Sequence, residues 1–157
     1  MSTDHVQSQI EQIAALPGKL DAALQGLSSA QLDLPCGQGE WTVRQVVHHL
    51  ADAHLNGFVR MKLVLTENKP ILKPYEQDRW IELHDMDAPL ESSLAILGGL
   101  HQRWHRLMAR LPGQSWSREG IHLESGLVNL RDLLDLYVDH GRQHLDQIRR
   151  LKKSLAL

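Results

Sequence analysis

Two histidines near the C-terminus, His140 and His144, have the spacing of a metal-binding pair. They stand in the stretch Leu-Tyr-Val-Asp-His-Gly-Arg-Gln-His-Leu, whose apolar residues recur at helical spacing. Residues four apart on a helix lie about one turn apart on the same face, so two imidazoles at this spacing can bind a single ion. The pair therefore predicts a metal site.

The same two histidines fall on the apolar stripe of their helix. At about 100° per residue, they share one narrow arc with four apolar side chains, Leu133, Tyr137, Ile148 and Leu151. Burying an imidazole that has no partner is costly. Hydrogen bonds within the core would also satisfy the two rings, but their spacing favours a metal. Asp139 and Asp146 lie off the stripe, and we expect them to be solvated.

Two imidazoles rarely hold a metal ion alone, so a third ligand is expected from another helix. The segment 42–67 offers three histidines, His48, His49 and His54. Periodicity places His54 near the centre of the apolar arc and His49 at its edge, with His48 on the opposite side. Helical spacing by itself therefore favours His54 as the third ligand.

Four helices are expected to position these side chains. Apolar stripes mark the ranges 5–27, 42–67, about 89–111 and 129–153, and alternating β-branched runs are nearly absent. Thr42 and Gln45 form a capping box at the start of the second range, and Asn129 is a good N-cap for the last. The segment 68–85 reads as a long loop with a helical turn near 78–84. The sequence predicts an all-α, antiparallel four-helix bundle, up-down-up-down, with a long loop between helices two and three.

Bulk composition excludes several classes of protein. The 157 residues fit one domain spanning 1–157, and the 17 basic and 19 acidic residues are interspersed, which does not favour nucleic-acid binding. No basic segment followed by an apolar run opens the chain, and no apolar run approaches about 18 residues. We therefore expect no membrane contact and a cytoplasmic location. The lone cysteine, Cys36, fits a reducing compartment and excludes a four-thiolate zinc site.

An ordered set of short motifs carries a family resemblance. The stretch Trp-Thr-Val-Arg-Gln-Val-Val-His-His-Leu-Ala-Asp from Trp41 to Asp52 is followed at a distance by His140-x-x-x-His144. This order strongly resembles the DinB/YfiT-like family of metal-dependent hydrolases and thiol transferases, from about residue 12 to 151. The resemblance is closest to the YfiT branch, whose N-terminal extension is missing here. Further matches to that branch are Asn56, Arg60, Lys62, Leu65-Thr66-Glu67 and the passage from Pro74-Tyr75 to Trp80.

The resemblance implies a four-helix bundle that holds one divalent metal ion through three histidines. The family's first ligand is the histidine before Leu-Ala, which in this sequence is His49. The other two ligands correspond to His140 and His144. We follow the family in preferring His49 to His54, because an edge position can still reach a neighbouring helix. His54 remains the alternative, or lines the same cavity.

Three neutral imidazoles leave a divalent ion with its full charge and an open position. Such a site can lower the pKa of bound water to about 7, or hold a thiolate and polarise an electrophile. Imidazole suits many divalent ions; we expect zinc or nickel, with iron, manganese and cobalt as alternatives. The expected reaction is hydrolysis, or transfer of a low-molecular-weight thiol to a small electrophilic molecule; the thiol version is implied by the resemblance alone. The alternative is a non-catalytic metal or small-molecule binding bundle.

Other residues near the expected site are not assigned a catalytic role, because no single carboxylate stands out as a general base. Asp52 lies one turn from His49 and could orient that ring, although a solvated charge is an equally good interpretation. Arg60 could attract an anionic substrate group or pair with Glu67 or Asp52. A homodimer, common among relatives, is expected through apolar positions such as Leu55, Val59 and Leu63.

Overall fold

The computed structural model describes residues 3–156, so Met1, Ser2 and Leu157 of the expected domain lie outside the described residues. Four long helices form the bundle: α1 (Thr3–Leu24), α3 (Val43–Thr66), α5 (Glu91–Met108) and α6 (Leu130–Ser154). A short helix, α2 (Ser29–Leu32), follows α1. None of the described helices is long and apolar enough to cross a membrane.

Capping side chains fix where the two helices that carry the expected ligands begin. Thr42 accepts a hydrogen bond from the backbone N–H of Gln45 at 3.2 Å, and the Gln45 side chain accepts from the Thr42 N–H at 3.0 Å. Asn129 accepts from the amides of Arg131 and Asp132 at the start of α6. These contacts satisfy amides that the first turn leaves free. The predicted capping box at Thr42 and N-cap at Asn129 are therefore both present.

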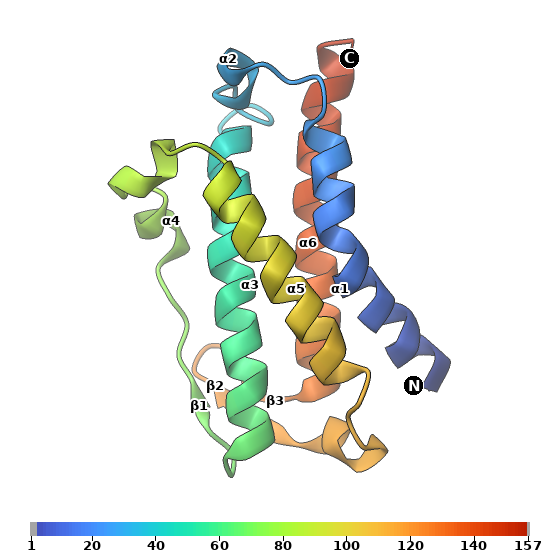
Figure 1. The fold of residues 1–157 in the computed structure, drawn as a ribbon. Helices are drawn as coiled ribbons and strands as arrows, with labels where there is room; N and C mark the ends of the chain where they lie inside the picture. Colours follow the sequence, from blue (N-terminus) through green and yellow to red (C-terminus); the bar gives the residue numbers. More distant parts are fainter. Residues whose placement is uncertain (1–2, 157) are drawn as a thin grey trace.

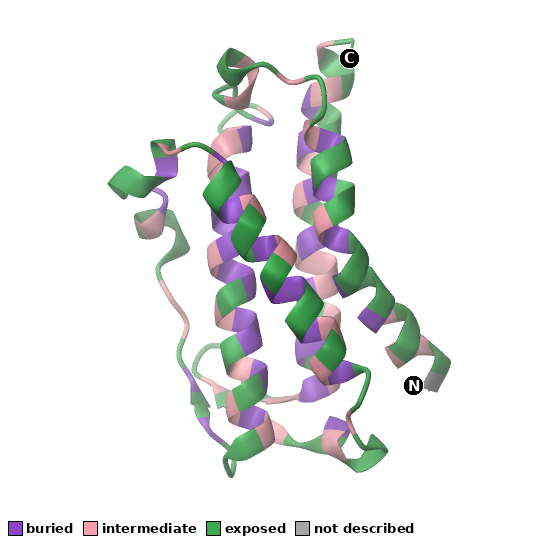
Figure 2. Cartoon of the chain, in the orientation of Figure 1, coloured by how far each residue is buried: buried purple, intermediate pink, exposed green. Residues whose placement is uncertain are grey.

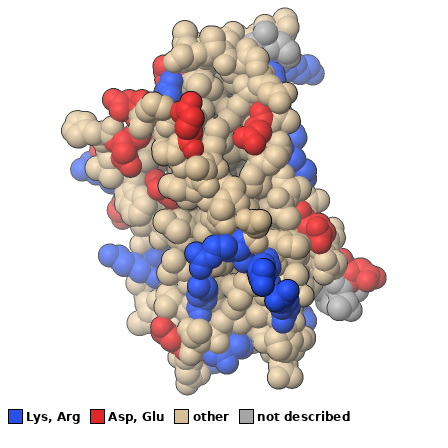
Figure 3. All heavy atoms as spheres, in the orientation of Figure 1, with Lys and Arg blue, Asp and Glu red and all other residues tan. Residues whose placement is uncertain are grey.

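Charge is distributed unevenly along α5. Its first turn contains Glu91, whereas its C-terminal half and the following turn contain Arg103, Arg106 and Arg110. Figure 3 shows basic side chains gathered over this end of the helix. Acidic groups near a helix N-terminus and basic groups near its C-terminus both oppose the helix dipole, so the arrangement stabilises α5.

The bundle core consists of two apolar clusters that meet at mid-height. One is built around Trp104, Met61 and Ile13, and the other around Leu50, Leu97 and Ile148. On α3 the second cluster ends at Ala51 and the first begins at Phe58, and on α6 they are separated between Tyr137 and Leu145. Buried positions follow the inner faces of all four helices (Figure 2). His54 of α3 and the two histidines of α6 lie in the layer between the clusters, and His49 lies level with the end of the second cluster.

Hydrogen bonds between helices give their relative directions. Along α3 and α5 the bonded residue numbers rise together, in the pairs His48 with Ser93, His54 with His101 and Met61 with Trp104. Along α3 and α6 they run in opposite senses, in the pairs His49 with His140 and Arg60 with Tyr137. Helices α3 and α5 are therefore parallel, and α3 and α6 are antiparallel.

The four-helix bundle with a long loop between the second and third long helices is confirmed, but the predicted up-down-up-down order is wrong. Helices α3 and α5 run in the same direction (Figure 1). Helices α1 and α6 are also parallel, as shown by the hydrogen bonds of His5 with Asp135 near their N-terminal ends and of Lys152 with the Gln25 carbonyl near their C-terminal ends. The connection 67–90 returns along the length of α3 before α5 begins. Its length permits this crossover.

The long connection contributes structure of its own. It contains strand β1 (Ile71–Leu72), the short helix α4 (Gln77–Trp80) and the 3₁₀ helix η1 (His84–Asp87). A second 3₁₀ helix, η2 (Gly113–Ser117), follows α5. The sequence prediction of one helical turn near 78–84 is close to α4, although α4 begins one residue earlier and is shorter.

The structure contains a small three-stranded sheet, although the sequence predicted an all-α protein. Strand β2 (Glu119–His122) pairs in parallel with β1 and antiparallel with β3 (Gly126–Asn129). Ile121 stands in register with Ile71 on one side and Leu127 on the other. Strands of two to four residues are too short to show a period of two in the sequence, so pattern analysis misses them.

Candidate metal centre

Three histidines from two antiparallel helices converge at mid-height of the bundle. His49 comes from α3, and His140 and His144 come from α6 one turn apart. The Nε2 atom of His140 lies 3.0 Å from Nε2 of His49 and 3.2 Å from Nε2 of His144. One ligand atom of each of the three residues lies within 4.8 Å of the others. The structure thus brings together the three residues that the family resemblance singles out.

The spacing of these nitrogens fits a shared metal ion. Zinc binds imidazole nitrogen at about 2.0–2.1 Å, which places two ligands of a tetrahedral ion about 3.3 Å apart. The 3.0 and 3.2 Å separations from His140 are close to this value. Residues already this close need little movement to coordinate one ion.

Hydrogen bonding orients the two rings from α6. His144 donates from Nδ1 to the side-chain oxygen of Gln147 at 2.6 Å, which leaves its Nε2 without a proton when the ring is neutral. His140 places Nδ1 3.3 Å from Nε2 of His54. Metal-binding histidines commonly use their second nitrogen in this way, and the contact fixes both tautomer and ring orientation.

Burial keeps the imidazoles uncharged. Burial, together with repulsion from a charge on neighbouring His144, lowers the pKa of His49 and of His140 to about 3. Burial also lowers the pKa of His144, although Gln147 opposes the shift. Neutral imidazoles are the form that binds metal, so at neutral pH the three rings offer lone pairs without first losing a proton.

The centre is buried on one side and accessible on the other. His49 is 3% exposed, whereas His140 and His144 are only partly buried. Trp41 stacks on the His144 ring at 6.1 Å and meets the His49 ring edge-on at 4.6 Å. The indole therefore restrains two of the three rings, and the two rings from α6 remain partly exposed.

His54, the alternative third ligand, lies behind the centre. It is fully buried, with its Nε2 against His140 Nδ1 and its Nδ1 3.0 Å from Nε2 of His101. Both of its nitrogens are occupied by other imidazoles, so it supports His140 instead of adding a nitrogen to the cluster. The periodicity argument for His54 correctly identified a buried histidine, but burial alone does not distinguish a ligand from its neighbour.

The other polar residues considered from the sequence lie in varied settings. Asp52 is half-buried, and burial raises the pKa of its carboxyl group with help from Asp85. Among the described residues it makes no side-chain hydrogen bond to His49. Arg60 donates to the hydroxyl of Tyr137 at 3.0 Å and to the carbonyl of Lys73 at 2.6 Å, instead of pairing with a carboxylate.

The sequence analysis missed the settings of three polar side chains near the centre, two of which bond to neighbouring histidines. His48 was expected on the opposite side of its helix, yet it is buried and bonds to Ser93 at 2.7 Å and to the Ala88 carbonyl at 3.0 Å. Gln147 and His101 received no role. The spacing of three between His144 and Gln147 could have indicated their contact, and His101 lies at helical spacing from the apolar Leu97 and Trp104.

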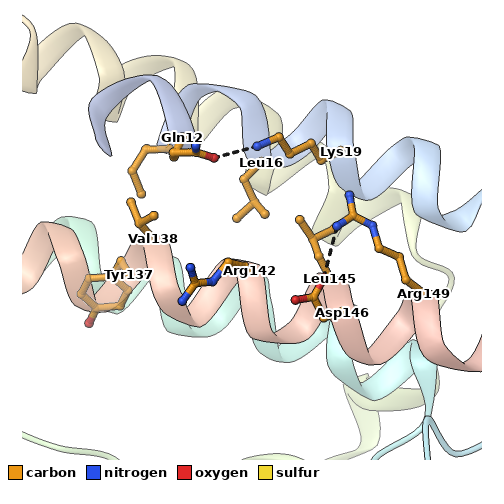
Figure 4. A pocket seen from close by; sticks show the side chains of 10 residues that line it. Gln12, Leu16, Lys19, Tyr137, Val138, Arg142, Leu145, Asp146 and Arg149 are labelled. Atoms are coloured by element: carbon orange, nitrogen blue, oxygen red, sulfur yellow. Dashed lines mark hydrogen bonds and ion pairs between the residues drawn. The ribbon is translucent and has the colours of Figure 1, made fainter. Parts of the chain in front are cut away.

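A distinct pocket elsewhere does not involve the three histidines. It has a volume of about 240 Å³ and lies between α1 and α6, where Gln12 and Lys19 face Arg142 and Arg149 (Figure 4). The charged groups there pair locally, Lys19 with Gln12 and Arg149 with Asp146. The candidate site is therefore the group of converging histidines and not this pocket, which contains none of them.

A helical bundle with a partly buried three-histidine cluster defines the class of protein, and comparison gives the family. Residues 12–148 match the DinB superfamily, and the chain belongs to it. A "putative metal-dependent hydrolase" of Bacillus cereus strain B4264 is 40% identical over 155 residues, covering 99% of this chain and 90% of the relative. A protein of the same description from Bacillus thuringiensis subsp. konkukian strain 97-27 shows the same identity and coverage.

A solved structure agrees with the computed one. YfiT from Bacillus subtilis, described as a "probable metal-dependent hydrolase with an unusual four-helix bundle topology", is 39% identical. It superposes with a TM-score of 0.96 over 99% of this chain and 90% of its own. The resemblance to the DinB/YfiT-like family is thereby confirmed.

Proposed function

We propose that this protein is a metal-dependent enzyme in which His49, His140 and His144 bind one divalent ion, zinc or nickel. The supporting observation is the convergence of their side-chain nitrogens, with Nε2 of His140 3.0 and 3.2 Å from those of its two neighbours. Burial keeps these rings neutral, so lone pairs face one another with no positive charge between them. A divalent cation satisfies all of them at once.

The reaction we propose is hydrolysis of a small molecule, or transfer of a low-molecular-weight thiol to a small electrophile. The names of the relatives support hydrolysis. An ion held by three imidazoles supplies an open position and a positive charge that activates water or a thiol. Arg60 donates to the Tyr137 hydroxyl one turn from His140, and we propose that it attracts an anionic group of the substrate. We place this activity in the cytoplasm, in a homodimer.

Metal content is the first test. Protein purified without an affinity tag is expected to contain close to one divalent ion per chain by elemental analysis, and His140→Ala is expected to contain almost none. His48→Ala is the control, because it also removes a buried histidine of the bundle but leaves the three ligands in place. Wild-type protein that takes up no stoichiometric zinc or nickel would refute the metal centre.

Activity requires a separate test. The metal-loaded protein is incubated with a panel of esters and amides, and in parallel with bacterial thiols and electrophiles, and products are identified by mass spectrometry. Hydrolysis that is lost in His140→Ala supports the first reaction, and thiol adducts lost in the same variant support the second. No metal-dependent product in either panel would favour a binding function without catalysis.

A further inference from the structure

A row of buried imidazoles leads from the centre to the backbone of α1. His140 Nδ1 lies 3.3 Å from His54 Nε2, His54 Nδ1 lies 3.0 Å from His101 Nε2, and His101 Nδ1 lies 2.6 Å from the carbonyl oxygen of Ile13. His54 and His101 are 0% and 1% exposed. Each of the four long helices contributes one residue to the row.

The backbone carbonyl at the Ile13 end of the row determines which nitrogen donates in each hydrogen bond. The Ile13 carbonyl can only accept, so His101 must carry a proton on Nδ1. A neutral imidazole has one N–H, which leaves His101 Nε2 as an acceptor for a proton on His54 Nδ1. By the same reasoning, His54 Nε2 accepts from His140 Nδ1, and His140 Nε2 is left bare where it faces His49 and His144.

The surroundings of the two intermediate rings support neutral forms. Burial lowers the pKa of His54 well below its usual range, and it lowers the pKa of His101 as well. The His54 ring stacks with that of His101 at a centroid distance of 4.9 Å and meets Trp104 edge-on at 5.9 Å, so its neighbours are aromatic rings and not carboxylates. Reversing a bond in the row would either leave the Ile13 carbonyl without its donor or set two unprotonated nitrogens against each other.

We propose that His54 and His101 are positioning residues. Because the Ile13 carbonyl accepts from His101, each imidazole in the row donates from Nδ1, and this keeps the proton of His140 on Nδ1 and leaves its Nε2 free to bind the metal. This inference rests on the proposed metal centre. It also makes the correct tautomer depend on assembly of the bundle, because the row exists only when α1, α3, α5 and α6 are packed together.

Zinc affinity of matched variants tests the role of His101. His101→Leu removes the acceptor for His54, whereas His101→Gln can still accept from His54 and donate to Ile13. His48→Leu is the control, since His48 is equally buried but bonds to Ser93 and Ala88 outside the row. Competition with a chromophoric chelator should show affinity roughly 10- to 100-fold weaker in His101→Leu, and close to wild type in His101→Gln and His48→Leu.

The tautomers can be read directly in the wild-type protein, which avoids any folding defect of a variant. Long-range ¹H–¹⁵N correlation spectra of ¹⁵N-histidine-labelled protein, recorded with zinc and after chelation, report which ring nitrogen carries the proton. We expect Nδ1–H at His54 and His101 in both states, and at His140 with zinc bound. Nε2–H at His54 or His101 would overturn the assignment.

The zinc-affinity measurements and the NMR spectra together distinguish failure of this inference from failure of the metal centre. If wild-type protein binds no zinc, the metal centre fails, and the spectra still decide the polarity of the row. If wild-type protein binds zinc and His101→Leu binds it as tightly, the positioning role is wrong while the centre stands. Equal weakening in His101→Leu and His101→Gln would likewise refute control through hydrogen-bond polarity.

Discussion

At the scale of single residues, the centre depends on which nitrogen of each imidazole faces inward. His140 obtains this orientation through two further histidines, but His144 obtains it from one residue on its own helix. Gln147 accepts its Nδ1–H at 2.6 Å, one turn further along α6. The two proposed ligands from α6 are therefore oriented by different residues, which can be substituted separately.

Substitution of Gln147 tests the support of His144. Gln147→Leu removes the acceptor, and we expect about tenfold weaker zinc binding. Gln147→Glu keeps an acceptor and makes it anionic, which strengthens the bond and should preserve or increase affinity. Titration against a competing chelator measures both. Equal affinity in Gln147→Leu and Gln147→Glu would show that this contact does not orient the ring.

The low pKa values of His49 and His140 predict a pH dependence of stability in metal-free protein. Burial lowers the pKa of His49 and His140 to about 3, whereas an unfolded histidine titrates near 6.5. Below about 6.5 the unfolded chain therefore binds protons that the folded chain does not. Stability is complete above that pH and falls as the pH is lowered toward 3.

Urea unfolding of chelator-treated protein at pH 7 and pH 5 measures this effect. Each of the two histidines should lower the free energy of unfolding by on the order of 2 kcal/mol between these pH values. His140→Gln should lose its own share of the dependence and serves as the control for the other titrating groups. An identical pH dependence in wild type and His140→Gln would contradict the expected burial of a neutral His140.

At the scale of elements, the crossing of α3 and α6 depends on a glycine. A Cβ atom at Gly57 would lie 2.5 Å from Cζ of Tyr137, which is closer than side-chain atoms can pack. Tyr137 also accepts the hydrogen bond from Arg60 and precedes His140 by one turn. The absence of a side chain at position 57 therefore lets α6 approach α3 closely enough for its histidines to reach His49.

Alanine at two glycines distinguishes close packing from helix propensity. Gly57→Ala forces Tyr137 to move, and we expect a loss of about 1–3 kcal/mol in unfolding free energy together with weaker metal binding. Gly99→Ala, on the exposed face of α5 with no atom within 4 Å of the new Cβ, should gain roughly 0.5–1 kcal/mol. Chemical denaturation compares them, and equal effects would refute the packing argument.

Element boundaries were predictable where local chemistry sets them, and element directions were not. The Thr42–Gln45 capping box and the Asn129 N-cap are local interactions, so they can be recognised from a few residues. The direction of α5 depends on the path of the segment 67–90, which contacts α3 and pairs with β2 far along the chain. No periodicity within that segment encodes the pairing.

At the scale of the whole molecule, an apolar strip on the outer face of α3 is consistent with the proposed homodimer. Leu55 and Val59 lie one turn apart and are 46% and 48% exposed. Leu63, the third position expected to take part, is partly buried against the core. The strip is therefore smaller than the sequence suggested, and it centres on the first two residues.

Light scattering after size exclusion tests the dimer. At micromolar concentration we expect wild-type protein at twice the mass of the chain, and Leu55→Glu combined with Val59→Glu as a monomer, because the charges would be buried unpaired. Ile96→Glu, at a similarly exposed apolar position on α5, should leave the dimer intact. Wild-type protein that runs only as a monomer would refute the proposal.

The sequence by itself determined the helices, their caps and the pairing of His140 with His144, because these depend on residues within a few turns of one another. It also indicated that a histidine of the second long helix would join them, although periodicity favoured His54 and only the family resemblance favoured His49. Tertiary structure decided the rest. Whether a buried imidazole faces its neighbours as a ligand or stands behind one as a support depends on helix direction, on the close approach allowed by Gly57, and on a carbonyl contributed by α1.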